Sequence, residues 1–298
     1  MERLRSILLG FEGRNYKAYK ELQGDTFEFE RFSLIIDHVQ GDPYAAPSRM
    51  RAVIPMAEAG IPEKALASKS RRRACRDFLA RAFRAAARRE PDLGIDAGTQ
   101  TVLARSACLF VGDTIELRFT ADMPGRGRRI LGRHAAQLLC TALPHAVEHA
   151  ALAANLDLAA LEQHCAVVED QDAMRSQLAD RGLVAFVADG ASLPRRSGKD
   201  DRPAREATLF KAPPSLKVTL RAPNAGEISG LGVRHGITLI VGGGFHGKST
   251  LLKALENGIY DHVPGDGRER VVTEGSAVKI RAEDGRSVAG ADISSFIG

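Results

Sequence analysis

The sequence has no tryptophan and few other aromatic residues. Aromatic side chains make up 5% of its 298 residues, whereas hydrophobic residues as a whole make up 44%. Aliphatic side chains and alanine must therefore fill the core. No apolar run approaches the roughly 18 residues that a membrane-spanning helix needs, and the apolar stretch at 7–9 is too short for a signal peptide. These absences predict a soluble, cytoplasmic protein of about two domains, without a membrane partner.

Cysteine is also scarce, and its spacing excludes some kinds of site. The four cysteines contain no C-x-x-C pair, which argues against a zinc knuckle. They are Cys75, Cys108, Cys140 and Cys165. Their number and spacing are typical of reduced, partly buried thiols in a cytosolic protein.

One segment carries a specific chemical signal. It matches the phosphate-binding pattern G-x-x-x-x-G-K-[ST] at every fixed position and reads Gly242, Gly243, Gly244, Phe245, His246, Gly247, Lys248, Ser249, Thr250. The preceding run 236–241 is apolar and β-branched, which predicts a buried parallel strand. Leucines at helical spacing follow the loop. Strand, glycine loop and helix therefore occur in the order that a triphosphate site requires.

The residue types fit the chemistry of ATP and Mg²⁺. Glycines let successive backbone N–H groups turn toward phosphate oxygens, and the start of the following helix favours anions. Lys248 is the predicted catalytic residue, because its ammonium would reach the β- and γ-phosphates. The hydroxyl of Ser249 is the predicted Mg²⁺ ligand, and Thr250 and the loop backbone would support both.

Two alternatives remain for the same residues. Gly242, Gly244 and Gly247 also spell the dinucleotide fingerprint G-x-G-x-x-G, and a glycine-rich turn could be purely structural. Neither alternative requires a lysine and a serine directly after the last glycine. Lys248 and Ser249 therefore favour the phosphate loop.

The segment 69–89 predicts a strongly basic helix. Its apolar residues share one face, and arginines with little counter-charge share the opposite face: Arg73, Arg76, Arg81, Arg84 and Arg88. The face is either solvated or a nucleic-acid interface that contacts the phosphate backbone. A second cluster could extend it, with Arg126, Arg128, Arg129 and Arg133. No aromatic residues interleave the arginines, so base stacking is not predicted there.

Three short motifs have mainly structural interpretations. His145 and His149 lie in H-x-x-E-H, an inverted zinc-protease pattern, but an ordinary pair at a helix start is the favoured interpretation. Asp37 and Asp42 lie near His38 in a loop-rich region. Glu283-Asp284-Gly285-Arg286 predicts a hairpin turn. The two acidic groups could still serve a nucleotide site indirectly.

The overall pattern predicts an α/β protein in two parts. An α+β N-terminal domain occupies residues 1–165, and a second domain occupies residues 166–298. The boundary is placed where helical character gives way to a strand pattern. A hairpin around Gly112-Asp113 and a run of helices over 130–165, interrupted at Pro144, are expected in the first domain.

The phosphate loop Gly-Gly-Gly-Phe-His-Gly-Lys-Ser-Thr resembles that of the predicted ABC-class ATPases. Phe245-His246 makes it specific, because transporter-type ABC ATPases commonly have a glycine at the position of Phe245. The resemblance extends along the chain, over 41–45, 183–190, 193–195, 264–269, 280–286 and 292–294.

The resemblance implies an ABC-type nucleotide-binding domain behind a family-specific N-terminal domain, and a homodimer that sandwiches two ATPs. Family members continue to a signature-like segment and a Walker B acid. We therefore expect this chain to be an N-terminal fragment with a truncated ATPase domain that binds ATP and hydrolyses it poorly. The alternative function is a nucleic-acid-binding protein, for RNA, that uses ATP as a conformational regulator.

Overall fold

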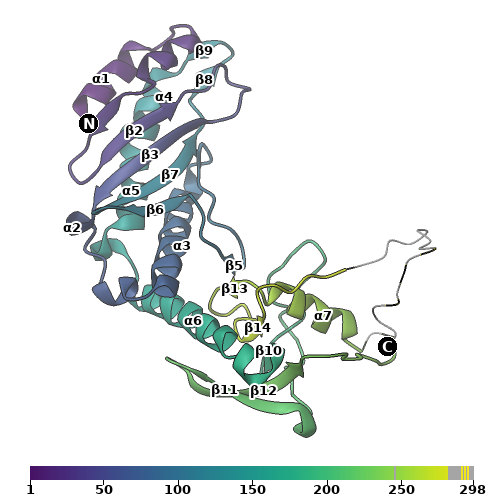
Figure 1. Cartoon of the computed structure of the whole chain (residues 1–298). Helices are drawn as coiled ribbons and strands as arrows, with labels where there is room; N and C mark the ends of the chain where they lie inside the picture. The colour runs from purple at the N-terminus through teal and green to yellow at the C-terminus, as the bar shows by residue number, and fades with distance from the viewer. Residues whose placement is uncertain (245, 281–289, 291, 293, 295–298) are drawn as a thin grey trace.

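The computed structural model describes residues 1–244, 246–280, 290, 292 and 294. The chain forms two parts that Figure 1 shows as the arms of an open crescent. Helices and sheets occur in both parts, so the predicted mixed α/β class is confirmed. None of the helices in the described part of the chain is long and apolar enough to cross a membrane.

The N-terminal part is built around an antiparallel sheet. Its strands lie in the order β1-β2-β3-β7-β4, and β6 also pairs with β7. Their bounds are β1 Thr26–Glu28, β2 Ser33–His38, β3 Ser48–Pro55, β4 Leu93–Gly94, β6 Cys108–Val111 and β7 Thr114–Ala121. Burial alternates along β3, as expected when one face of a sheet meets the core. The predicted hairpin at Gly112 is confirmed, since β6 and β7 pair there and Gly112 has φ 57°.

Helices cover one face of this sheet (Figure 1). They are α1 Glu2–Gly10, α2 Met56–Ala59, α3 Lys69–Ala86, α4 Gly132–Gln137 and α5 Leu143–Ala151, with 3₁₀ turns η1 Tyr16–Leu22, η2 Glu63–Leu66, η3 Ala87–Arg89 and η5 Ala153–Asn155. The predicted basic helix is confirmed as α3 followed by η3. The Ser68 side chain caps α3 by accepting a hydrogen bond from the Arg71 N–H.

The predicted interruption at Pro144 is a change of helix type. A π-helical turn, η4 Leu138–Ala142, joins α4 to α5, and Pro144 follows it at the start of α5. Proline lacks the N–H that an α-helix would direct at the carbonyl four residues earlier. A wider turn directly before the proline accommodates this missing donor.

One long helix, α6 Leu158–Ser176, belongs to both parts. Its first half places Leu161, Cys165 and Val168 in the core beneath the N-terminal sheet. Met174, near its end, packs in a second core with Phe186. The predicted boundary near residue 165 falls inside this helix and stays a prediction.

The C-terminal part contains a second antiparallel sheet, in the order β11-β12-β10-β14. The elements of this C-terminal part are η6 Ala179–Arg181, β10 Leu183–Ala188, η7 Pro214–Leu216, β11 Lys217–Ala222, β12 Gly226–Arg234, α7 Lys248–Asn257 and β14 Val271–Thr273. Two small pairs complete the fold: β5 Thr101–Val102 with β13 Asp261–His262, and β8 Gly125–Arg126 with β9 Arg129–Ile130. The β5–β13 pair links the two parts directly.

Candidate phosphate-binding site

The glycine loop leads directly into α7. The helix begins at Lys248, and Gly247 at its N-cap has φ 82°. Gly242 has φ 151°. Both values lie in the region that favours glycine, so the loop needs glycine at these two positions to turn toward the helix.

The side chain of Lys248 folds back over the loop. Its Nζ donates to the carbonyl oxygen of Gly242 at 2.6 Å and to that of Gly243. These partners are neutral dipoles, and the loop is open to solvent. Within residues 1–244 and 246–280, no carboxylate pairs with this ammonium to cancel its charge.

The start of α7 offers backbone donors to an anion. No side chain caps the helix at Gly247. The first intrahelical bond runs from the Leu251 N–H to the Gly247 carbonyl at 2.9 Å. The N–H groups of residues 248–250 thus precede the helical hydrogen-bond ladder, and an anion at this end would satisfy them. Ser249 lies exposed in the same turn.

The imidazole ring of His246 packs against the loop backbone at Gly243. A Cβ added at Gly243 would lie 3.1 Å from the His246 Cε1 atom, so the ring lies over a residue that has no side chain. A larger residue at 243 would push this ring away. Phe245, which was also predicted to bind the nucleotide, lies outside the described residues.

The far end of α7 is anchored. Ala254 is fully buried against Val187 and Val271. The Thr273 hydroxyl donates to the Leu255 carbonyl at 2.7 Å, and Arg175 Nη2 donates to the Gly258 carbonyl at 3.2 Å. The helix that carries Lys248 and Ser249 is therefore fixed to the sheet and to α6.

The prediction of a buried parallel strand over 236–241 is wrong for this structure. The segment is irregular, and its apolar side chains are exposed: Ile237 by 103%, Leu239 by 81% and Val241 by 73%. Within residues 1–244 and 246–280, no strand pairs with it. β-branched residues favour a strand only where a neighbouring strand satisfies the backbone and covers the side chains.

The arginines of α3 take part in contacts within the chain. Arg73 pairs with Asp172 and Asp261, and Arg81 pairs with Asp77. Arg76 donates to the carbonyls of Cys108 and Arg105, and Arg84 donates to that of Gly98. Arg88 is exposed. Carboxylates and carbonyls of the same chain therefore pair with most of the arginines that suggested a nucleic-acid interface. Nucleic-acid binding by this helix stays a prediction.

Sequence reasoning missed the ionic network that joins the two parts. Asp261 is 4% exposed and contacts Arg73 of α3 and Arg175 of α6. Arg71, 3% exposed, pairs with Glu162 and Glu169 of α6. The partners lie 86 to 188 positions apart in sequence, so no local spacing could have revealed them.

Where the structure describes the remaining short motifs, their side chains make local contacts, and an indirect role at a nucleotide site stays a prediction. The rings of His145 and His149 stack with centroids 4.0 Å apart, and the described residues contain no group of three or more metal-ligating side chains. Asp37 pairs with Arg51, and Asp42 accepts the Tyr44 N–H. The turn predicted at 283–286 lies outside the described residues.

The loop and helix together define a P-loop protein. The chain belongs to the ABC-class ATPase family: residues 1–154 match the model described as "ATPase of the ABC class N-terminal", and residues 157–298 match that of its P-loop domain. An uncharacterized protein of Methanocaldococcus jannaschii is 32% identical over 135 residues, which cover 43% of this chain and 30% of that protein. The matched region thus spans less than a third of that relative's length.

Proposed function

We propose that this chain binds ATP with Mg²⁺ through the loop Gly242–Thr250. The observation that carries the proposal is the loop geometry. The glycine turn places the Lys248 ammonium beside the uncapped N-terminus of α7, on the surface of the protein. An ammonium beside free N–H groups suits a polyphosphate better than a neutral ligand.

Each group has a distinct role in this proposal. Lys248 exchanges the Gly242 and Gly243 carbonyls for phosphate oxygens, a stronger, charge-assisted contact. The N–H groups at the start of α7 bind further phosphate oxygens, and the Ser249 hydroxyl is a ligand for Mg²⁺. Bound Mg²⁺ would neutralise charge on the β- and γ-phosphates.

The whole protein is, in our proposal, an ATPase that works as a homodimer. The family membership supports an ABC-type arrangement in which two nucleotide-binding domains enclose ATP. The four free, buried cysteines support a reducing, cytoplasmic compartment.

Thermal unfolding with ATP and MgCl₂ tests the binding proposal. Because ligand that binds only the native state stabilises it, we expect the unfolding temperature of the wild type to rise with ATP concentration. Lys248→Ala should lose most of this rise while unfolding at the same temperature without ATP, since the partners of its ammonium in the described part of the chain are two loop carbonyls. Equal ATP-dependent rises in both proteins would contradict the assignment.

A further inference from the structure

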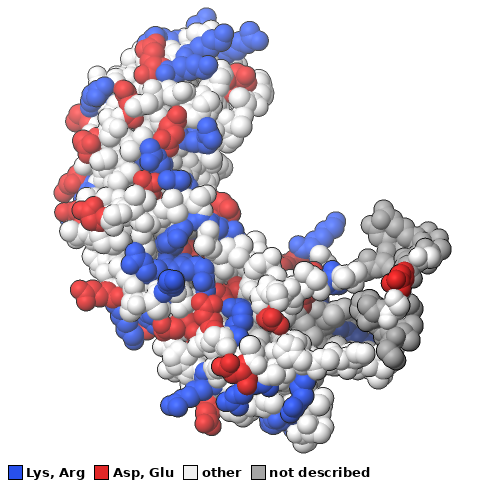
Figure 2. Space-filling view, in the orientation of Figure 1, with Lys and Arg blue, Asp and Glu red and all other residues white. Residues whose placement is uncertain are grey.

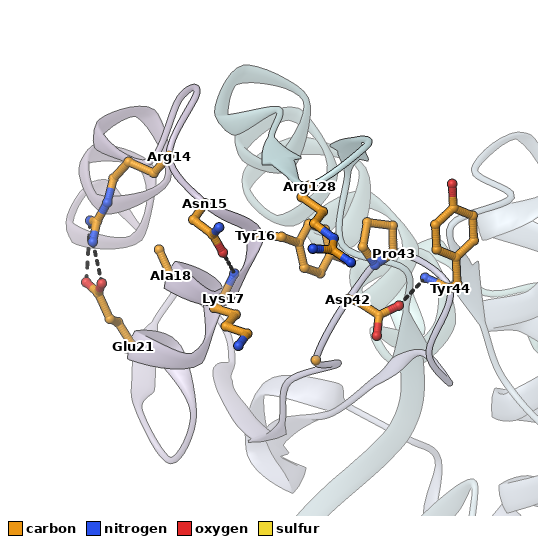
Figure 3. Close-up of a pocket in the computed structure, with 11 residues that line it drawn as sticks. Arg14, Asn15, Tyr16, Lys17, Ala18, Glu21, Asp42, Pro43, Tyr44 and Arg128 are labelled. Carbon is orange, nitrogen blue, oxygen red and sulfur yellow. Dashed lines mark hydrogen bonds and ion pairs between the residues drawn. The ribbon is translucent and has the colours of Figure 1, made fainter.

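A cavity lies in the N-terminal part, on different elements from the phosphate loop. It has a volume of about 910 Å³ and is lined by three segments: residues 14–18 with Glu21, the loop 41–44, and Arg128 (Figure 3). The volume falls within the range typical of small-molecule sites, roughly 300–1,000 Å³. In Figure 2, lysine and arginine side chains gather at this upper end of the molecule, near β8 and β9.

One wall of this cavity is rigidly built. The Tyr16 hydroxyl donates to the Met123 carbonyl at 2.6 Å, and the Tyr16 N–H donates to the Arg128 carbonyl at 2.9 Å. A Cβ at Gly125 would lie 2.7 Å from the Tyr16 ring, so glycine permits this close approach. The neighbouring positions 17 and 128 therefore sit on backbone segments that are bonded to each other.

The cationic side chains on this wall differ in whether a carboxylate pairs with them. Arg14 forms an ion pair with Glu21. Lys17 and Arg128 are exposed, and within the described residues neither side chain has an ion-pair or hydrogen-bond partner. Two unpaired cations that line one cavity repel each other, and a bound anion would relieve that repulsion.

The loop 41–44 adds an exposed aromatic ring to the lining. Tyr44 is 91% exposed, although its backbone is fixed by the hydrogen bond from its N–H to Asp42 Oδ1 at 2.8 Å. The base of the loop is held by buried Gln40, whose Oε1 accepts the Met123 N–H at 2.9 Å. An exposed aromatic ring on a fixed turn is a platform on which a planar group can stack.

The carboxylate of Asp42 narrows the class of ligand that this cavity could bind. It lines the same cavity as Lys17 and Arg128 (Figure 3). A simple polyanion would be repelled by it, whereas a ligand that carries both a phosphate and hydroxyl or amine donors would use it as an acceptor. Phosphate, donor groups and a planar ring occur together in a nucleotide.

We propose that this cavity binds a nucleoside monophosphate unit, with the phosphate on Lys17 and Arg128 and the base on Tyr44. The unit is either a free nucleotide or part of a single strand of RNA. The site is separate from the phosphate loop, because no lining residue comes from 242–250.

Isothermal titration calorimetry of the purified chain tests this proposal. The titrants are AMP, inorganic phosphate and a single-stranded RNA of about ten nucleotides. EDTA in the buffer and a parallel titration of Lys248→Ala separate this site from the phosphate loop. We expect AMP to bind with a dissociation constant below about 1 mM, equally in the wild type and in Lys248→Ala.

Three variants locate the ligand. Lys17→Ala/Arg128→Ala should weaken both AMP and phosphate by at least about tenfold, because charge-assisted hydrogen bonds are lost. Tyr44→Ala should weaken AMP by about tenfold and leave phosphate unchanged, because only stacking is lost. Arg126→Ala, an exposed arginine on β8 outside the lining, is the matched control and should bind as the wild type does.

The outcomes separate the two sources of the nucleotide. Binding of AMP, or of RNA, that is lost in Lys17→Ala/Arg128→Ala supports the proposal and identifies a free nucleotide or a strand as the source. No binding of either titrant by the wild type would overturn it. It would also be overturned if the double variant bound as the wild type does, or if Tyr44→Ala left AMP binding unchanged.

Discussion

Charged side chains in this chain differ widely in their exposure and in the partners that surround them. Lys248 is half-buried at the loop, and its ammonium has only backbone carbonyls as partners among the residues that the structure describes. Asp266 carries its charge in the interior, 0% exposed, with Arg195 Nη2 at 2.6 Å and His262 Nδ1 at 2.9 Å. The first arrangement suits a ligand site, and the second is part of the fold.

Asp266 leads to a prediction about acid stability. Burial alone would raise the pKa of its carboxyl, but His262 and Arg195 outweigh burial and hold the pKa below its ordinary value of 3.8. The stabilisation is therefore present above that ordinary value and is lost as the pH falls through the lower, folded value. We expect Asp266→Asn to be less stable than the wild type at pH 7, and the difference to shrink below about pH 4. Urea unfolding at both pH values measures this, and a difference that grows with acid would contradict it.

The cysteines lead to a prediction about thiol reactivity. All four are buried and free. Burial raises the pKa of Cys165 to about 11 and that of Cys108 to about 12, and it also raises the pKa values of Cys75 and Cys140. Because the thiolate is the reactive form, native protein at pH 8 should react slowly with Ellman's reagent. Four thiols should react quickly in urea. A thiol that reacts quickly in the native protein would contradict the burial of all four cysteines.

At the scale of elements, α3, α6 and the segment after α7 are joined through Asp261. This carboxylate contacts Arg73 of α3 and, at 2.9 Å, Arg175 of α6. It follows α7 by only a few residues, so the anchored end of the phosphate-binding helix is tied to the N-terminal part.

Removing the charge of Asp261 should destabilise this junction. Asp261→Asn leaves two arginines without a buried partner, and we expect a loss of about 3 kcal/mol in unfolding free energy. Arg88→Ala, an exposed arginine at the C-terminal end of the same basic segment, should change stability by less than about 0.5 kcal/mol. Urea denaturation of both variants makes the comparison. Equal stability of the two would mean that the Asp261 contacts contribute nothing.

The elements also explain what the sequence could predict. The phosphate loop was found because its chemistry fixes residue types at fixed spacing, and α3 and α7 were found because apolar residues recur at helical spacing. The segment 236–241 was wrongly predicted as a buried strand, because a strand depends on neighbours that local sequence does not show. The partners of Arg71 and Arg73, and the cavity around Lys17, Tyr44 and Arg128, are assembled from distant segments and could not be predicted.

At the scale of the whole molecule, the two parts share α6 and the β5–β13 pair, while the phosphate loop lies exposed at the start of α7. The exposed loop would leave a bound nucleotide open to enclosure by a second subunit, as the proposed homodimer requires. We expect multi-angle light scattering of the protein to give a dimer mass with ATP and Mg²⁺, and a smaller dimer fraction for Lys248→Ala. An unchanged monomer mass in saturating ATP would contradict the proposed homodimer.

Equilibrium dialysis with labelled ATP tests the central claim most directly, because it counts the nucleotide that the phosphate loop holds. The account predicts one ATP per chain whose binding requires both Mg²⁺ and Lys248: Ser249→Ala should bind it more weakly and with less dependence on Mg²⁺, and Lys248→Ala should lose at least about tenfold in affinity. Binding of ATP by Lys248→Ala with the affinity of the wild type would contradict it.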